Sequence, residues 1–158
     1  MIKFENVSVT YPGGVEALKD LNLEIKDGDF IIIVGLSGAG KSTLLRTVNN
    51  LVKPSTGSVY LEGKNVTSAK KKELKKIRSQ IGMIFQTFNL VNRSTVLKNV
   101  LTGRLSNIST IRSILGLWPK DQKEMAFEAL NQVEILEKAY VRASNLSGGQ
   151  QQRVGIAR

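Results

Sequence analysis

The 158-residue chain is predicted to be an α/β protein with an antiparallel β-rich start and a helical segment towards its end. Residues 30–34 form an apolar run that leads into a glycine-rich loop and then into an amphipathic helical pattern at residues 42–50. The order strand, loop, helix opens an α/β unit. Polar and apolar residues alternate at residues 2–10, which predicts a half-buried strand. From residue 95 onward the pattern is mostly helical.

The predicted strands follow in chain order. The first strand, residues 2–10, has a break near Asn6, and a turn at residues 11–14 leads into a hairpin-like second strand at residues 17–25. Residues 30–34 are apolar throughout, as expected of a strand that is covered on both faces. A short strand is predicted at residues 58–61. The apolar run at residues 81–85 predicts a second buried strand.

The predicted helices begin with a basic helix at residues 70–80. Further helices are predicted at residues 95–105, 108–117 and 121–136. Asp121 with Glu124 suggests a capped start for the last of these. A final helix is expected to begin at the glycine pair of residues 148–149.

Composition limits the possible functions. The hydrophobic fraction of 41% suffices for a core, and the absence of cysteine excludes disulfides and thiolate metal sites. Histidine, the commonest general base, is also absent. We expect no membrane span, because no apolar run approaches about 18 residues. The N-terminus lacks a signal-peptide pattern, which predicts a cytoplasmic protein.

The formal net charge is +10, and much of it lies in residues 64–78, where six lysines and one arginine stand against Glu73. Such a surplus is typical of proteins that meet nucleic acid, anionic lipid or phosphate-bearing ligands. It is also typical of a solvated helix face, which is the interpretation we favour at this stage.

A phosphate-binding loop is the first motif that carries chemistry. Residues 35–42 read G-L-S-G-A-G-K-S and match the pattern G-x-x-x-x-G-K-[ST] in full. Glycines let successive N–H groups point at phosphate oxygens, and the following helix adds its positive N-terminal end. Lys41 is expected to reach the β- and γ-phosphates, and the Ser42 hydroxyl to coordinate Mg²⁺. The predicted ATP ligands in this loop are Gly35, Ser37, Gly38, Gly40, Lys41, Ser42 and Thr43.

A second motif makes the family recognisable. Residues 146–150 read L-S-G-G-Q and continue as Q-Q-R, which resembles the signature of ATP-binding cassette (ABC) ATPases. A serine hydroxyl and two glycine N–H groups at a helix start form a second anion site. The resemblance implies that this site acts on the γ-phosphate of ATP bound to a partner subunit, in a head-to-tail dimer that holds two ATP molecules. The residues concerned are Ser147, Gly148, Gly149 and Gln150.

Two further positions match the family. Gln86, directly after the apolar run at residues 81–85, corresponds to the glutamine that contacts Mg²⁺ or the attacking water. Lys41 and Gln86 are thus the predicted catalytic residues, and Ser42 and Gln86 the predicted Mg²⁺ ligands. Tyr11 matches the aromatic residue that stacks on adenine, with Val15 placed under the same base. Trp118 is expected to pack or to contact a partner, not to bind nucleotide.

The resemblance covers the whole chain and is greatest to the ATP-binding subunits of phosphonate importers, on residues 88–93, 99–105 and 138–143. It implies one nucleotide-binding domain with a P-loop NTPase core. Residues 1–89 would form the β subdomain and core, residues 90–146 a helical subdomain, and residues 147–158 the signature helix.

The resemblance also implies partners. In the family the helical insert docks on membrane permease subunits, and an extracytoplasmic solute-binding protein delivers the solute. The chain is therefore expected at the cytoplasmic face of the membrane as a peripheral subunit, in the import of an organophosphonate or phosphate ester. No nucleic acid is expected as a partner.

A complete cassette continues past the signature helix to a strand ending in aspartate, then a glutamate, and later a histidine. The chain ends at Arg158 and contains no histidine. The sequence therefore predicts that the C-terminal part of the core is missing and that the chain alone has negligible ATPase activity. It also predicts that residues 30–34 lack a strand neighbour, which would make the chain marginally stable or poorly soluble.

Three alternatives stay open. One is an importer of another small solute, such as an amino acid or phosphite, because the solute never touches this subunit. Another is a soluble cassette protein that acts on nucleic acid, although the basic run has no interleaved aromatic residues for base stacking. The third is a nucleotide-binding module without turnover.

Overall fold

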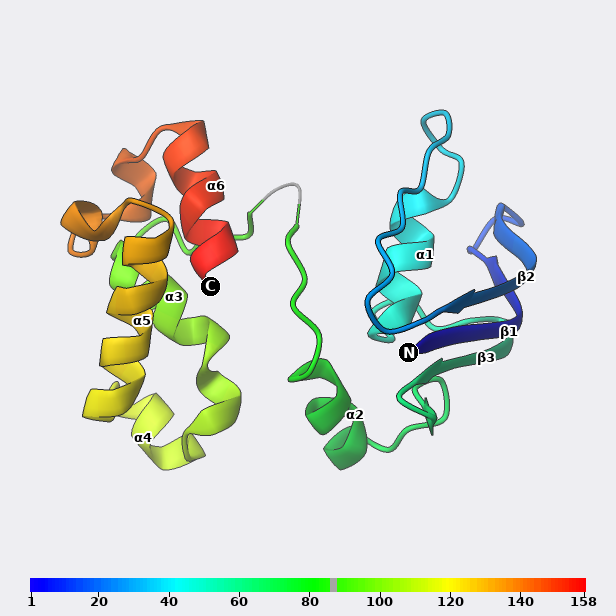
Figure 1. Cartoon of the computed structure of the whole chain (residues 1–158), viewed down its shortest axis with the longest axis horizontal. Coiled ribbons are helices and arrows are strands. Elements are labelled where there is room, and N and C mark those ends of the chain that lie inside the picture. The colour runs from blue at the N-terminus through cyan, green and yellow to red at the C-terminus, as the bar shows by residue number, and fades with distance from the viewer. Residues whose placement is uncertain (86–87) are drawn as a thin grey trace. The chain divides into compact units, whose positions relative to one another are not determined.

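A computed structural model describes residues 1–85 and 88–158 of the chain, with only the backbone described for Asn107, Thr110 and Ile114. The chain divides into two compact units, Met1–Ile81 and Gly82–Arg158. The first unit holds a β-sheet with two helices, and the second is helical (Figure 1).

The sheet of the first unit has four antiparallel strands in the order β2-β1-β3-β4. The strands are β1 (Ile2–Thr10), β2 (Glu16–Ile25), β3 (Thr56–Leu61) and β4 (Lys64–Asn65). The predicted strands at residues 2–10, 17–25 and 58–61 are confirmed, and β4 was not foreseen. Its two residues are too few to give a pattern in the sequence.

The predicted break near Asn6 is a real irregularity of β1. The pairing register with β2 shifts between Phe4 and Val7, and Asn6 has a φ of 46°. The side chain of Asn22 stabilises this bulge, because its Oδ1 accepts from the Asn6 N–H at 2.9 Å and its Nδ2 donates to Asn6 Oδ1 at 2.9 Å. The bulge thereby keeps its polar groups bonded.

The core of the first unit lies between the sheet and two helices, α1 (Lys41–Val48) and α2 (Lys71–Arg78). The alternation of β1 and β3 turns one row of side chains towards these helices. The basic helix predicted at residues 70–80 is confirmed as α2. The fully buried members of this core are Phe4, Val7, Leu44, Val59, Leu61, Val66 and Ile77.

The two buried strands that the sequence predicts at residues 30–34 and 81–85 are not formed. Both segments are irregular backbone, and the exposed fraction is 86% for Phe30, 86% for Val34 and 61% for Ile84. A buried strand requires hydrogen-bonded neighbours and covered faces. Among the described residues, no strand pairs with either segment, so apolar composition alone does not make them strands.

The second unit packs its helices around one apolar core, drawn from green to red in Figure 1. The helices are α3 (Val96–Gly103), α4 (Thr110–Ile114), α5 (Lys120–Gln132) and α6 (Gly148–Ala157), with short 3₁₀ turns η1 (Leu105–Asn107), η2 (Leu136–Lys138) and η3 (Ala143–Asn145). Helices were predicted at all four places. Trp118 is partly buried against this core, in line with a packing role.

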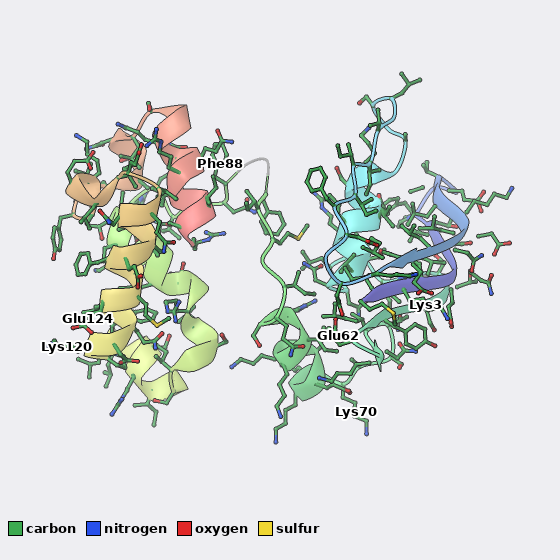
Figure 2. The ribbon with its side chains drawn as sticks, in the orientation of Figure 1. Lys3, Glu62, Lys70, Phe88, Lys120 and Glu124 are labelled. Carbon is green, nitrogen blue, oxygen red and sulfur yellow. The ribbon has the colours of Figure 1, made fainter. Side chains whose placement is uncertain are left out.

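The predicted cap of α5 is wrong. The helix begins at Lys120 with Pro119 at the N-cap, and no side chain caps it. Asp121 Oδ2 instead accepts from Gln122 Nε2 at 2.7 Å, and Glu124 forms an ion pair with Lys120 at 3.6 Å (Figure 2). Proline has no N–H to lose and a φ already restricted to helix-compatible values, so it can open a helix without a side-chain cap. No helix among the described residues is long and apolar enough to cross a membrane.

Candidate functional site

The phosphate-binding loop joins the irregular run at residues 30–34 to the start of α1. Gly38 and Gly40 have φ values of 84° and 82°, a region that favours glycine. A Cβ at Gly40 would collide with the carbonyl oxygen of Ala17 in β2. The turn is closed by a hydrogen bond from the Ala39 N–H to Leu36 O at 3.2 Å. The loop therefore depends on its glycines for its path beside the sheet.

Lys41 folds back onto the loop. Its Nζ donates to the carbonyl oxygens of Gly35 at 2.7 Å and Leu36 at 2.6 Å. The ammonium group is thus held against the loop backbone, where a charge-assisted hydrogen bond to a phosphate oxygen could replace the bonds to these carbonyls.

The first turn of α1 offers free hydrogen-bond donors. Its N-cap is Gly40, which provides no side-chain cap, and the turn contains no acidic residue. Helix N-termini leave backbone N–H groups without helical partners and carry partial positive charge. The Ser37 and Ser42 side chains are exposed, whereas Thr43 is 8% exposed. The loop and helix start therefore present an anion site.

Tyr11 lies next to this site. Its hydroxyl and Thr43 Oγ1 are 3.1 Å apart and hydrogen-bonded, although the two residues are far apart in the chain. Tyr11 follows β1, and its N–H donates to Val15 O at 2.9 Å across the turn. Val15 is 62% exposed. The structure brings the predicted adenine-stacking residue to the phosphate loop, through a bond that sequence reasoning did not foresee.

The signature residues form the start of α6. Ser147 is the N-cap in a capping box, since its Oγ accepts from the Gln150 N–H at 3.4 Å and its own N–H donates to Gln150 Oε1 at 3.0 Å. Gly148 and Gly149 are exposed in the first turn. The four predicted residues therefore lie together on one helix end.

Two residues that follow the signature, Gln151 and Arg153, hold the start of α6 in place through hydrogen bonds. Sequence reasoning gave neither of them a role. Gln151 Nε2 donates to the carbonyl oxygens of Ala143 and Leu146, each at 3.3 Å. Arg153 Nη1 donates to Val133 O at 3.0 Å and pairs with Glu134 Oε2 at 3.1 Å. The available signal was the presence of long polar side chains in the first turns of the helix that the sequence predicts to begin at residues 148–149.

A hollow of about 370 Å³ lies beside this helix start. Two carboxylates line it: Glu134, which follows α5 and is paired with Arg153, and Glu137 in η2. The lining residues are Glu134, Ile135, Glu137, Ser147, Gly149, Gln150 and Arg153.

The remaining predicted residue, Gln86, lies outside the described residues. The phosphate loop belongs to the first unit and the signature to the second. Within residues 1–85 and 88–158, no group of three or more His, Cys, Asp or Glu side chains could hold a metal ion. Ser42 is thus the predicted Mg²⁺ ligand whose position the structure gives.

A family model described as ABC transporter matches residues 18–158. The chain therefore belongs to the ABC transporter family, which confirms the resemblance drawn from the two motifs.

Curated relatives of the chain include ATP-binding proteins of phosphonate import. The chain is 60% identical to the phosphonates import ATP-binding protein PhnC of Bacillus thuringiensis subsp. konkukian, over all of this chain and 62% of that protein. The chain thus spans about three fifths of the length of the curated relatives it matches.

Solved cassettes have the same fold. The dimeric structure of MJ0796, a bacterial ABC transporter cassette, is 39% identical with a TM-score of 0.87, over 99% of this chain and 68% of that chain. A dimeric post-hydrolysis state of the same cassette, bound to ADP and Pi, is 38% identical with a TM-score of 0.84 over the same 99% and 68%. The predicted fold class is confirmed, apart from the two unformed strands.

Proposed function

We propose that this chain belongs to the ATP-binding, energy-coupling subunit of an ABC importer for phosphonates. The observation that carries the ATP-binding part is the loop around Lys41, with the uncapped helix start behind it. The solute assignment rests on the 60% identity to a phosphonates import ATP-binding protein.

In this proposal ATP binds through its phosphates at the start of α1. Lys41 Nζ would exchange its hydrogen bonds to the carbonyl oxygens of Gly35 and Leu36 for bonds to β- and γ-phosphate oxygens. Backbone N–H groups of the loop complete the cradle. The Tyr11 ring stacks on adenine. The phosphate-contacting set is Gly35, Ser37, Gly38, Gly40, Lys41, Ser42 and Thr43.

The loop also fits Mg²⁺. This ion usually takes only one or two protein ligands and completes its shell with water and phosphate oxygens. The exposed Ser42 hydroxyl at the helix start suits that role, and Gln86 would be the second ligand. When bound, the ion would neutralise charge on the phosphates.

The signature is proposed to act on ATP held by a second copy, in a head-to-tail dimer. Support comes from the exposed glycines and from the capping box, which fixes Ser147 while leaving its hydroxyl at the helix start. The relative MJ0796 is itself a dimer in its solved structures. Ser147, Gly148, Gly149 and Gln150 would contact the γ-phosphate.

The wider assignment follows the family. We infer membrane permease subunits and, indirectly, an extracytoplasmic solute-binding protein as partners, and a peripheral place at the cytoplasmic face of the membrane. The subdomain division at residues 1–89, 90–146 and 147–158 belongs to the same proposal. ATP hydrolysis by this chain alone should be negligible, because the catalytic glutamate of the family follows the signature helix and the chain has no histidine.

The test is Lys41→Ala with MgATP titrated by calorimetry. Loss of charge-assisted hydrogen bonds to phosphate should weaken binding by about 100-fold or more. Lys53→Ala, an exposed lysine outside the loop, is the matched control and should bind as the parent does. Equal affinity of the Lys41→Ala variant and the parent would contradict the assignment.

A further inference from the structure

A strongly basic hollow lies beside α2, away from the phosphate loop in the sequence. Its volume is about 430 Å³. Figure 2 shows the Lys70 side chain projecting from the start of α2. Four lysines and one glutamate line the hollow, so its charge is strongly positive. The lining residues are Lys64, Lys70, Lys72, Glu73, Lys76 and Ile77.

These lysines lack compensating partners. None of the four forms an ion pair or a side-chain hydrogen bond with any residue in the described part of the chain. A second hollow, of about 460 Å³ over β1 and β2, differs in this respect. There Lys3 and Glu5 pair at 2.6 Å, and their hydrogen bond raises the pKa of Lys3 and lowers that of Glu5. Because these four lysines are exposed, water solvates their ammonium groups, which remain available to an anion from outside the chain.

Two of these lysines, Lys72 and Lys76, lie within α2, which is held in the first unit, and Lys64 lies in β4. Ile77 is 1% exposed and anchors α2 in the core, with Leu74 packed beside it. Arg78 ties the end of α2 to the end of α1, since its Nε donates to Asn49 O at 2.8 Å and its Nη2 to Asn50 O at 3.0 Å. A charged cluster on a held helix loses less entropy on binding than one on a free loop.

The helix start adds to the attraction. Lys70 is the N-cap of α2 and provides no side-chain cap, so the first-turn N–H groups carry partial positive charge, which the Glu73 carboxylate in the same turn offsets in part. No aromatic side chain lines the hollow, so it has no platform on which a base would stack. These features favour phosphate groups over nucleobases as the ligand chemistry.

We propose that this hollow binds a small ligand that carries two or more phosphate groups. Four lysines line one concavity, and their flexible side chains can turn several ammonium groups toward clustered phosphates, which a single monoanion would engage less fully. Free polyphosphates and the headgroups of phosphate-rich lipids share this chemistry. The site is separate from the proposed ATP site and does not depend on it.

The experiment titrates tripolyphosphate into the whole chain in a Lys41→Ala background, where the loop contributes least. Lys72→Gln with Lys76→Gln should weaken binding at least about tenfold, since both side chains line the hollow. The matched control is Lys71→Gln with Lys75→Gln, which removes the same charge from the same helix outside the lining and should cost at most about threefold. Circular dichroism confirms that all variants fold alike.

An equal loss of tripolyphosphate affinity in the two double variants would overturn the proposal. It would indicate attraction by the overall positive charge of the helix and not binding in the hollow. Absence of tripolyphosphate binding by the Lys41→Ala chain itself would overturn it too. Co-sedimentation with vesicles of phosphatidylinositol bisphosphate in phosphatidylcholine distinguishes the sources: binding lost only in the Lys72→Gln/Lys76→Gln variant supports a lipid headgroup in the hollow. Vesicle binding without tripolyphosphate binding would instead indicate contact with a flat membrane surface, and it would refute ligand binding in the hollow.

Discussion

The two motifs that are predicted to bind phosphate differ in how their surroundings support them. The signature begins after Leu146, which is 7% exposed, and its helix is anchored by Val154, which is fully buried. The phosphate loop follows Val34, which is 86% exposed, in a segment that forms no strand. Each motif has its local geometry, but the phosphate loop is entered from a mostly exposed segment, in which Ile33 is partly buried against the core of the first unit.

The difference has a physical origin. The signature is held by contacts that are close in sequence, such as the capping box and the Gln151 bonds to Ala143 and Leu146. A buried strand instead needs neighbours on both edges. The described sheet, β2-β1-β3-β4, gives residues 30–34 no such neighbour.

The largest difference in unfolding free energy is expected between alanine variants of two valines, Val154 and Val34. Val154→Ala should lower the free energy of unfolding of the second unit by about 2 kcal/mol, because buried methyl groups are lost and a cavity remains. Val34→Ala, the same change at an exposed position, should alter stability by less than about 0.5 kcal/mol. Urea unfolding followed by fluorescence of Trp118, the single tryptophan, reports on the second unit, and circular dichroism reports on the whole chain.

An equal cost at Val34 would show that residues 30–34 are buried in solution and would remove the contrast. In a longer chain that supplies strand neighbours, the same Val34→Ala change should become costly. A larger loss of unfolding free energy on Val34→Ala in the longer chain than in the present one is the more stringent test.

Sequence reasoning succeeded for most features whose signal is local, although the local cap predicted for α5 is wrong. The alternation around β1 and β2, the helical periods and the helix start at residues 148–149 depend on neighbouring residues, and each of these predictions is confirmed. It was wrong to predict strands at residues 30–34 and 81–85, because apolar composition shows only a tendency to be buried, although the predicted lack of a strand neighbour for residues 30–34 agrees with the described sheet. It also missed the Tyr11–Thr43 and Arg153–Glu134 contacts, which join residues that only the folded chain brings together.

A smaller effect is expected at the signature cap. Ser147→Ala should destabilise the second unit by about 1 kcal/mol, because the Gln150 N–H loses its acceptor. Ser144→Ala is the control, since its hydroxyl bonds only the neighbouring Asn145 side chain at 3.0 Å, and it should stay within about 0.5 kcal/mol. Trp118 fluorescence in urea measures both changes.

A second variant at Ser147 separates the effect of the side chain on stability from its effect on the contact with ATP. Ser147→Asp keeps a side-chain acceptor and should retain the stability, but its charge should repel a γ-phosphate and prevent ATP-dependent dimerisation in light scattering. Loss of stability in the aspartate variant would mean that the cap does not explain the alanine result.

The smallest effect is expected at Tyr11. Tyr11→Phe removes the hydroxyl bonded to Thr43 but keeps the ring, so stability should fall by less than about 1 kcal/mol and ATP affinity should change by at most about threefold. Tyr11→Ala also removes the ring and should weaken the affinity for ATP by about tenfold, which is the contribution of one base-stacking contact. Calorimetry with ATP compares the two variants. Equal losses in both would assign the role of Tyr11 to its hydroxyl, acting through Thr43 on the phosphate loop, and would rule out adenine stacking.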